Sequence, residues 1–252
     1  MARIIMSGCC GKMGRVIANE VKKRPDCEIV AGLDINKDGI LGFPIFQYAE
    51  DINVDADVVI DFSNPSALSS LLIYCIEKKL PVIICTTGYS DVQIEQIKEA
   101  AHVIPVFYSG NMSLGINLII ELAKRAATVF GDSFDIEIVE KHHNQKIDAP
   151  SGTALMIADG ISSVMDSAPE YVYDRHSYRR ARSKNEIGIH SIRGGSIVGE
   201  HEVIFAGHDE VLTISHLAQS KEIFAVGAIN AAMFMVGKSE GMYNMSDLLG
   251  NR

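Results

Sequence analysis

The sequence predicts an α/β protein with two domains: a parallel sheet covered by helices on both faces, and a smaller α+β domain that carries a mixed sheet. Strand-like and helix-like segments alternate through the first half of the 252-residue chain. Three strand-like segments later follow one another with short connections, and an apolar helix-like segment comes near the end. Alternation favours a parallel sheet, whereas consecutive strands favour an antiparallel or mixed sheet.

The first domain is predicted from five short apolar runs and the segments between them. Residues 12–23 and 65–78 repeat apolar side chains at spacings of three and four, which is typical of helices packed on one face. The apolar runs are four to six residues long, as expected for buried strands. The predicted strands are 3–7, 28–33, 57–61, 82–85 and 103–107.

The second domain begins where this alternation stops. Residues 170–186 are polar and rich in arginine, so we expect a surface loop or insertion there. The apolar segment 221–236 is long enough to return and pack on the first domain. We therefore predict one domain from residues 1–112 and 218–252, and a second from 113–217. The other predicted elements are helices over 112–130 and 151–165, and strands over 134–139, 187–193, 200–206 and 211–216.

The composition argues against a protein that binds nucleic acid or a membrane surface. The chain has 23 Lys and Arg against 32 Asp and Glu, a net charge of -9. A small anionic ligand would therefore need a local group of positive side chains. The five cysteines are odd in number and lack C-x-x-C spacing, so we interpret them as reduced thiols of a cytoplasmic protein. We expect neither a secretory leader nor an apolar run of the roughly 18 residues that span a bilayer.

Residues 8–14, GCCGKMG, lie between the first predicted strand and the first predicted helix. Glycines at this place let the backbone turn tightly and approach a pyrophosphate, whose charge the helix N-terminus stabilises. This is typical of a Rossmann-type dinucleotide site, although the G-x-x-G-x-x-G spacing differs slightly from the usual one.

Asp34 closes the second predicted strand, twenty residues past Gly14. A carboxylate there accepts hydrogen bonds from the adenosine ribose and repels a 2'-phosphate. The alternative is that Asp34 only begins a turn. Lys12 and Arg15 could offset the repulsion, so the cofactor is either NADH or NADPH.

Two more loops are predicted at the same edge of the sheet. CTTGY, residues 85–89, ends the fourth strand, and YSGNMS, residues 108–113, follows the fifth. Ligands of open parallel sheets lie beyond the carboxyl ends of the strands. The small polar side chains of both loops could contact a nicotinamide ribose or carboxamide, or the loops could be ordinary turns.

The segment EKHHNQKIDAPSGTA, residues 140–154, contains two adjacent histidines. Neighbours on an extended segment point to opposite sides, and no H-x-x-x-H or cysteine pattern accompanies them, so we predict no metal site. Two surface histidines are one alternative. The other is a proton-transfer site, because His142, His143 and Lys146 place three proton-donating or cationic groups within five positions.

The end of this segment predicts an anion site. Ser151, Gly152 and Thr153 open a predicted helix, whose first amides are oriented to bind an anion. Cationic groups followed by a helix start suit a substrate that carries carboxylates. The proton-donating groups suit a reaction in which this substrate is protonated as it is reduced.

Together these segments resemble the 4-hydroxy-tetrahydrodipicolinate reductase family, also called dihydrodipicolinate reductase. The resemblance covers essentially the whole chain, and its most specific part is E-x-H-H-x-x-K-x-D-A-P-S-G-T. The matching segments are GCCGKMGR, DFSNP, TTG, GNMSLGIN, DIEIVEKHHNQKIDAPSGTA and GEHEVIFAGHDEVLTISH. The resemblance implies NAD(P)H-dependent reduction of 4-hydroxy-tetrahydrodipicolinate to tetrahydrodipicolinate, on the route to diaminopimelate and lysine.

The resemblance also implies residue roles. His142 would act in acid/base chemistry, Lys146 would donate a proton, and His143 would hold substrate carboxylates with the segment Ser151, Gly152 and Thr153. The first domain would bind the dinucleotide, and the second would bind substrate and build a homotetramer. The implied cofactor contacts are Gly8, Cys9, Cys10, Gly11, Lys12, Met13, Asp34, Cys85, Thr86, Thr87, Ser109, Gly110, Asn111 and Met112.

Three positions depart from the family pattern. Cys85 stands where glycine is common, which would place a thiol near the cofactor. Ile35 stands where several members carry an arginine for a 2'-phosphate, which favours NADH. We assign no role to residues 166–186.

Two other classes of protein fit less well. A nucleotide-sensing regulator would need a basic DNA-reading module, which this acidic chain lacks. An acylating aldehyde dehydrogenase would need a nucleophilic cysteine facing the substrate, but all five cysteines lie within the first 85 residues.

Overall fold

A computed structural model describes residues 1–36 and 41–250. The chain forms two compact units: unit 1 comprises Met1–Leu114 with Glu222–Arg252, and unit 2 comprises Gly115–Lys221. No helix among the described residues is long and apolar enough to cross a membrane.

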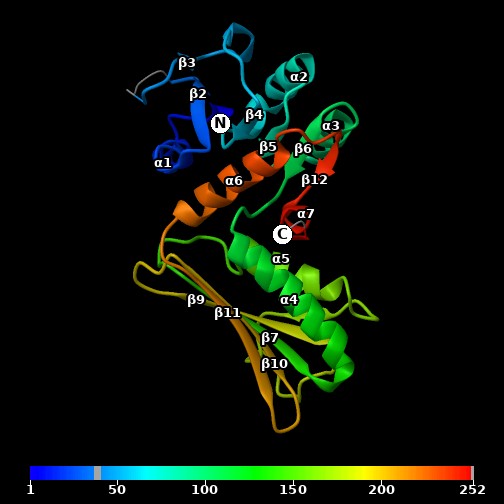
Figure 1. Cartoon of the computed structure of the whole chain (residues 1–252). Helices are drawn as coiled ribbons and strands as arrows, with labels where there is room; N and C mark the ends of the chain where they lie inside the picture. The colour runs from blue at the N-terminus through cyan, green and yellow to red at the C-terminus, as the bar shows by residue number, and fades with distance from the viewer. Residues whose placement is uncertain (37–40, 251–252) are drawn as a thin grey trace. The chain divides into compact units, whose positions relative to one another are not determined.

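Unit 1 contains a seven-stranded sheet in the order β12-β6-β5-β4-β1-β2-β3, and all its pairings are parallel (Figure 1). Its central strands are mostly apolar and buried because both faces are covered, which confirms the predicted parallel sheet. The strands are β1 (Ala2–Ser7), β2 (Cys27–Leu33), β3 (Ile45–Phe46), β4 (Val58–Asp61), β5 (Val82–Ile84), β6 (Pro105–Tyr108) and β12 (Gly241–Tyr243).

Helices cover both faces of this sheet. Successive side chains of a strand point to opposite faces, so Ile4 belongs to one apolar core and Ile5 to the other. The first core includes residues of α1 (Lys12–Val21), α6 (Glu222–Met235) and α7 (Met245–Gly250). The second includes residues of α2 (Leu68–Lys78) and α3 (Asp91–Ala101). Short 3-10 turns form at η1 (Ala49–Asp51) and η2 (Pro65–Ala67).

The predicted return of the last long helix is confirmed. Helix α6 contacts α1 and strands β4 and β5 (Figure 1). Gly227 and the alanines of this helix are buried. A side chain at Gly227 would place its Cβ 1.7 Å from the carbonyl oxygen of Met112. The small residue therefore lets α6 approach the loop that follows β6.

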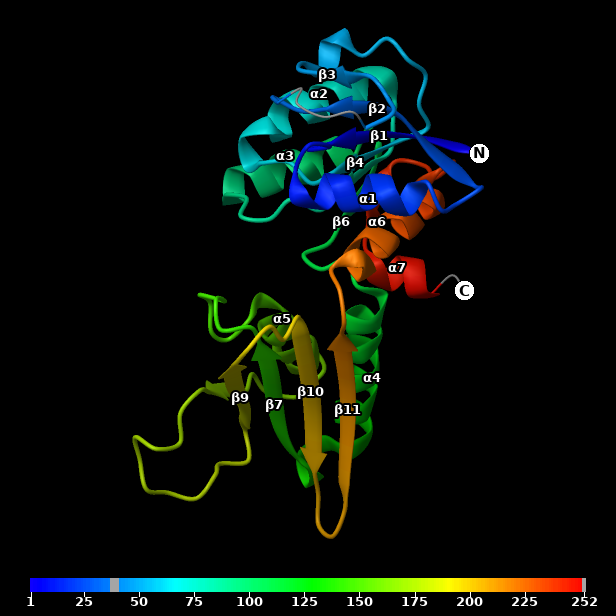
Figure 2. The same ribbon diagram turned by 90° about the vertical axis from the view of Figure 1, so that its left-hand side faces the viewer.

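Unit 2 contains the predicted mixed sheet, in the order β11-β10-β7-β9-β8 (Figure 2). Strand β10 is antiparallel to both neighbours, whereas β7, β9 and β8 run parallel to one another. Helices α4 (Leu114–Phe130) and α5 (Gly152–Ser162) contribute to the apolar core on one face. The strands are β7 (Asp135–His142), β8 (Glu170–Val172), β9 (Glu186–Arg193), β10 (Gly199–Ala206) and β11 (Val211–Ala218), and η3 (Gly131–Ser133) precedes β7.

Two predicted boundaries in unit 2 were wrong. Strand β7 continues to His142 instead of ending at residue 139, because its alternating burial pattern extends through Glu140 and His142. Residues 170–186 are not a simple loop, since residues 170–172 form β8 and residue 186 starts β9.

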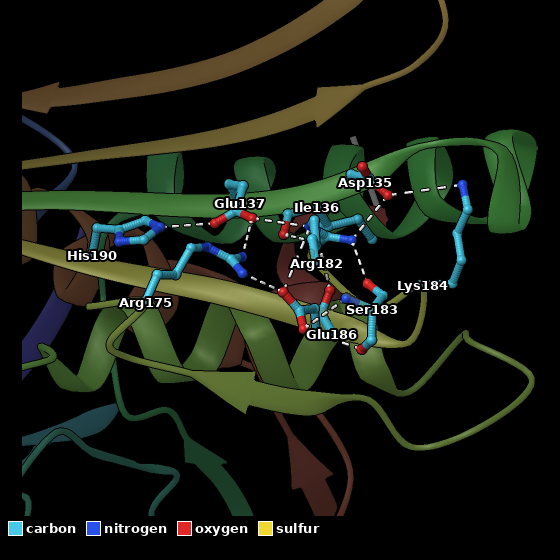
Figure 3. Close-up of polar contacts among 9 residues, drawn as sticks. All are labelled: Asp135, Ile136, Glu137, Arg175, Arg182, Ser183, Lys184, Glu186 and His190. Carbon is cyan, nitrogen blue, oxygen red and sulfur yellow. Dashed lines mark hydrogen bonds and ion pairs between the residues drawn. The ribbon is translucent and has the colours of Figure 1, made fainter. Parts of the chain in front are cut away.

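The arginine-rich part of that segment is attached to the sheet by an ion-pair network (Figure 3). Arg175 donates to Glu137 at 2.5 Å and also to Glu186. Arg182 donates to Asp135 at 2.9 Å and to the carbonyl oxygen of Glu186 at 2.7 Å. Polar residues give no periodic apolar signal, so the sequence did not predict this attachment.

Candidate active site

The glycine loop after β1 requires small residues at two close approaches. Gly8 has a φ of +79°, and a Cβ there would lie 2.5 Å from the carbonyl oxygen of Phe62. A Cβ at Gly14 would lie 2.2 Å from the carbonyl oxygen of Gly8. Gly11 is the N-cap of α1 and, as a glycine, has no side chain to bond the first amides. The exposed helix start at Gly11 and Lys12 is therefore suited to an anion.

Asp34 lies directly after β2 and contacts this loop. One of its oxygens accepts a hydrogen bond from the backbone N–H of Cys10 at 2.8 Å, and the other accepts from Asn36 at 3.0 Å. The carboxylate is partly exposed. The structure thus brings Asp34 to the glycine loop, and its hydrogen bond with Cys10 holds the loop in place.

Asp61, at the end of β4, is a fully buried carboxylate that the sequence reasoning did not assign. It accepts hydrogen bonds from the Ser63 hydroxyl at 2.6 Å, the Thr86 hydroxyl at 2.7 Å and the Tyr89 hydroxyl at 3.4 Å. Burial, followed by the charge of Asp61, raises the pKa of Tyr89. Asp61 therefore positions the loop after β5. Its place at the carboxyl end of a predicted parallel strand could have identified it from the sequence.

The expectation of a cofactor-facing thiol at Cys85 does not fit the structure. Its side chain is buried in the core, and burial raises its pKa well above the ordinary value. Thr86 is also buried, whereas Thr87 is exposed.

The loop after β6 is ordered by its own polar groups. The Ser109 hydroxyl donates to the carbonyl oxygen of Asn111 at 2.9 Å, and the Asn111 side chain accepts from the backbone of Ser113 at 2.8 Å. Met112 is buried and Gly110 is exposed. This loop and those after β1, β2 and β5 all lie at the carboxyl edge of the parallel sheet, where nucleotides bind in this fold class.

The centre of the unit 2 site is Glu140, whose side chain is 0% exposed. Arg193 donates to its two oxygens at 2.8 and 2.7 Å, and the backbone N–H of Ser151 donates at 3.1 Å. The Nδ1 atom of His142 lies 2.5 Å from the same carboxylate. Burial by itself raises the pKa of Glu140, but the hydrogen bonds, led by those from Arg193, lower it to about 2. Glu140 is therefore ionised at neutral pH.

His142 ends β7 and is buried, in contact with a second histidine. Its ring meets that of His201 edge to face, with ring centroids 5.2 Å apart. The Nε2 atom of His201 lies 3.1 Å from the Ser151 hydroxyl, which caps α5 by accepting from Ala154. Burial lowers the pKa of His201 to about 4, so this ring is neutral at pH 7.

The turn after β7 carries the other predicted residues. The backbone N–H of Lys146 donates to the carbonyl oxygen of His143 at 3.1 Å, and its ammonium lies 2.9 Å from Asp148. His143 is partly exposed, unlike the buried His142. Gly152 is exposed at the start of α5, and a Cβ there would have no described atom within 4 Å. A ligand therefore has room beside this helix start.

Three residues of this site were missed: Glu140, Arg193 and His201. Glu140 stands two positions before His142, so on a strand both point to the same face, and this spacing was an available signal. Arg193 and His201 come from β9 and β10, and only the strand register brings them to Glu140.

The fold and the two sets of residues define the class of protein. Unit 1 carries a glycine loop, a ribose-type acid and two polar loops at one edge of a parallel sheet, and unit 2 carries a buried Glu–His pair beside a helix start. The protein is an oxidoreductase that uses a nicotinamide nucleotide.

The chain belongs to the dihydrodipicolinate reductase family. The family model for the N-terminus matches residues 2–112, and the model for the C-terminus matches residues 115–249. The 4-hydroxy-tetrahydrodipicolinate reductase of Clostridium tetani is 53% identical over 251 residues, covering 100% of this chain and 98% of that protein. The enzyme of the same name from Caldanaerobacter subterraneus subsp. tengcongensis is 53% identical over 249 residues, covering 99% of this chain and 98% of that protein.

Solved structures show the same fold. The dipicolinate-bound dihydrodipicolinate reductase from Paenisporosarcina sp. TG-14 matches with a TM-score of 0.81 and 26% identity, covering 97% of both chains. The scyllo-inositol dehydrogenase from Lactobacillus casei with bound NAD(H) matches with a TM-score of 0.58 and 14% identity, covering 99% of this chain and 93% of that one. The second likeness concerns the fold alone.

Proposed function

We propose that this protein reduces 4-hydroxy-tetrahydrodipicolinate to tetrahydrodipicolinate with NADH or NADPH, in the biosynthesis of diaminopimelate and lysine. The observation that carries the proposal is the buried Glu140–His142 pair beside the N-terminus of α5, in a chain whose relatives bear this activity in their names. A cyclic dicarboxylate needs a proton source and an anion site, and this segment supplies both.

The reaction adds one hydride and one proton and releases the 4-hydroxyl group of the substrate as water. The reduced nicotinamide would supply the hydride when bound and would leave oxidised. Glu140 holds Nδ1 of His142, so Nε2 is the ring nitrogen left for exchange with substrate or water. Lys146 is the second proton donor and cation. The amides at Gly152 and Thr153, together with Ser151 and His143, bind and orient the carboxylates.

In unit 1, the proposed cofactor contacts are the glycine loop, Asp34 and the loops after β5 and β6. Asp34 accepts hydrogen bonds from the adenosine ribose in addition to holding the loop. Ile35 is 80% exposed and offers no charge to a 2'-phosphate, which favours NADH. Lys12 is exposed at the helix start and leaves use of NADPH open.

We also propose a cytoplasmic homotetramer built through the sheet of unit 2. The face of this sheet opposite α4 and α5 carries Val211 and Leu217, which are 64% and 54% exposed, and Ile192, which is 46% exposed. Large apolar side chains gathered on one sheet face favour burial against another copy.

The test measures initial rates with enzymatically generated substrate, NADH or NADPH, and pyridine-2,6-dicarboxylate as a competitor. His142→Gln and Lys146→Ala are each expected to lower kcat by about 10²- to 10⁴-fold, the usual contribution of a positioned acid or base. His208→Gln is the matched control, because that side chain is 97% exposed in a remote turn of unit 2. Absence of NAD(P)H oxidation would refute the activity, and near-normal rates for both variants would refute the residue assignment.

A further inference from the structure

Two adjacent cysteines of the glycine loop lie close to one carboxylate. The Sγ atoms of Cys9 and Cys10 are 3.9 Å apart. One ligand atom from each of Cys9, Cys10 and Asp34 lies within 4.8 Å of the other two. Within residues 1–36 and 41–250, this is the only such group of three metal-ligating side chains.

The surrounding backbone directs these three groups toward one another. Cys9 is buried, and its sulfur packs directly against Gly32. A Cβ added at Gly32 would lie 2.5 Å from this sulfur. Cys10 is partly exposed, and its thiol lies 3.1 Å from the carbonyl oxygen of Asn36. Each oxygen of Asp34 accepts one backbone hydrogen bond, which leaves lone pairs on both.

The distances match the requirements of a soft divalent cation. Two thiolates that bind tetrahedral Zn²⁺ at about 2.3 Å are about 3.8 Å apart, close to the separation of Cys9 and Cys10. Thiolates select Zn²⁺ and similar soft ions over Mg²⁺ or Ca²⁺. Two sulfurs and one carboxylate oxygen fill three of the four coordination positions of a tetrahedral cation. Because Cys10 is partly exposed, water can reach the fourth position.

We propose that Cys9, Cys10 and Asp34 form a binding site for a soft divalent cation, Zn²⁺ or Cd²⁺, and that this cation and the dinucleotide exclude each other. The exclusion rests on the proposed function, because Asp34 would otherwise bind the adenosine ribose and the loop amides the pyrophosphate. A cation between Cys10 and Asp34 occupies the carboxylate that the ribose needs. Metal binding itself does not depend on that function.

Binding must displace protons from the thiols. The Cys9 side chain must lose its proton to coordinate, because the thiolate and not the thiol is the metal ligand. Coordination converts it to a thiolate, and its proton passes to the buffer. At least one proton is therefore released for each ion bound, and a weakly buffered solution detects it.

The experiment titrates the reduced, metal-free protein with Cd²⁺ and follows the ultraviolet absorption of the cadmium–thiolate bond. We expect one site per chain, with proton release, and at least about tenfold weaker binding for Cys10→Ser, since one of three ligands is lost. Cys27→Ser is the matched control, because Cys27 is a buried thiol of β2 outside the group. Equal affinity in the wild type and Cys10→Ser would overturn the site.

Asp34→Asn and NADH provide the second part of the test. The Asp34→Asn variant should bind Cd²⁺ more weakly while keeping the cadmium–thiolate absorption. Saturating NADH should raise the apparent Kd for Cd²⁺ at least about tenfold, as competition for one site requires. An unchanged Kd in the presence of bound NADH would overturn the exclusion. Failure to bind NADH at all would instead refute the proposed function, while Cd²⁺ binding through Cys10 would still support the metal site.

Discussion

Replacement of Glu140 by Gln should destabilise the protein by about 3 kcal/mol at neutral pH. The pKa of Glu140 falls from its ordinary value of 4.5 to about 2, and at about 1.4 kcal/mol per pKa unit this corresponds to about 3 kcal/mol. Removal of one partner from a buried ion pair typically destabilises a protein by about 3 to 5 kcal/mol, which is a similar magnitude. The substitution would leave the Arg193 side chain, only 20% exposed, without its carboxylate partner.

The same pKa defines the pH window of the effect. Because the carboxyl pKa is lowered in the folded state, its contribution is present above pH 4.5 and is lost as the pH falls toward 2. The difference in unfolding free energy between wild type and Glu140→Gln should therefore shrink to less than half by pH 3. Urea unfolding at pH 7 and pH 3, at one protein concentration, measures this difference.

A matched control comes from the next strand of the sheet. Glu202 bonds to Lys141 at 2.9 Å, but its side chain is 30% exposed and Lys141 also contacts Glu200. Glu202→Gln should change the unfolding free energy by less than about 1 kcal/mol at either pH. An effect of Glu140→Gln at pH 7 as small as that of this control, or an equally large effect at pH 3, would refute the proposed contribution of Glu140.

Two further predictions concern unit 2. Arg182→Ala should speed hydrogen exchange across residues 172–186, because the guanidinium bonds to Asp135 and to three backbone carbonyls (Figure 3). The exposed Arg179→Ala is the control, and equal exchange in both variants would contradict the role of Arg182. His201→Gln should flatten the pH dependence of stability between pH 6.5 and 4. The lowered pKa of His201 makes the unfolded chain bind the extra proton there, so wild type loses about 3 kcal/mol as the pH falls. Denaturant unfolding of wild type and His201→Gln between pH 6.5 and 4 measures this difference. If the stability of the variant depends on pH as strongly as that of wild type, His201 is not the group responsible.

The elements of this fold that depend on local patterns were predictable, whereas those that depend on distant contacts were not. Apolar periodicity predicted five of the seven strands of unit 1, helices α1, α2, α4 and α5, and the returning α6, because each of these patterns lies within one segment. The same method missed β3 and β12, which are only two and three residues long, and the polar attachment of residues 170–186. Short strands and ion pairs leave no periodic signal.

By itself, the sequence determined the glycine loop, the position of Asp34 and the segment of residues 140–154, since each is a contiguous pattern with its own local geometry. Only the tertiary structure decided which partners reach these residues. Arg193 is 53 positions from Glu140, and the parallel register of β7 and β9 brings the two together. Such contacts depend on strand order and register, which are set by the packing of the whole sheet and not by any one segment.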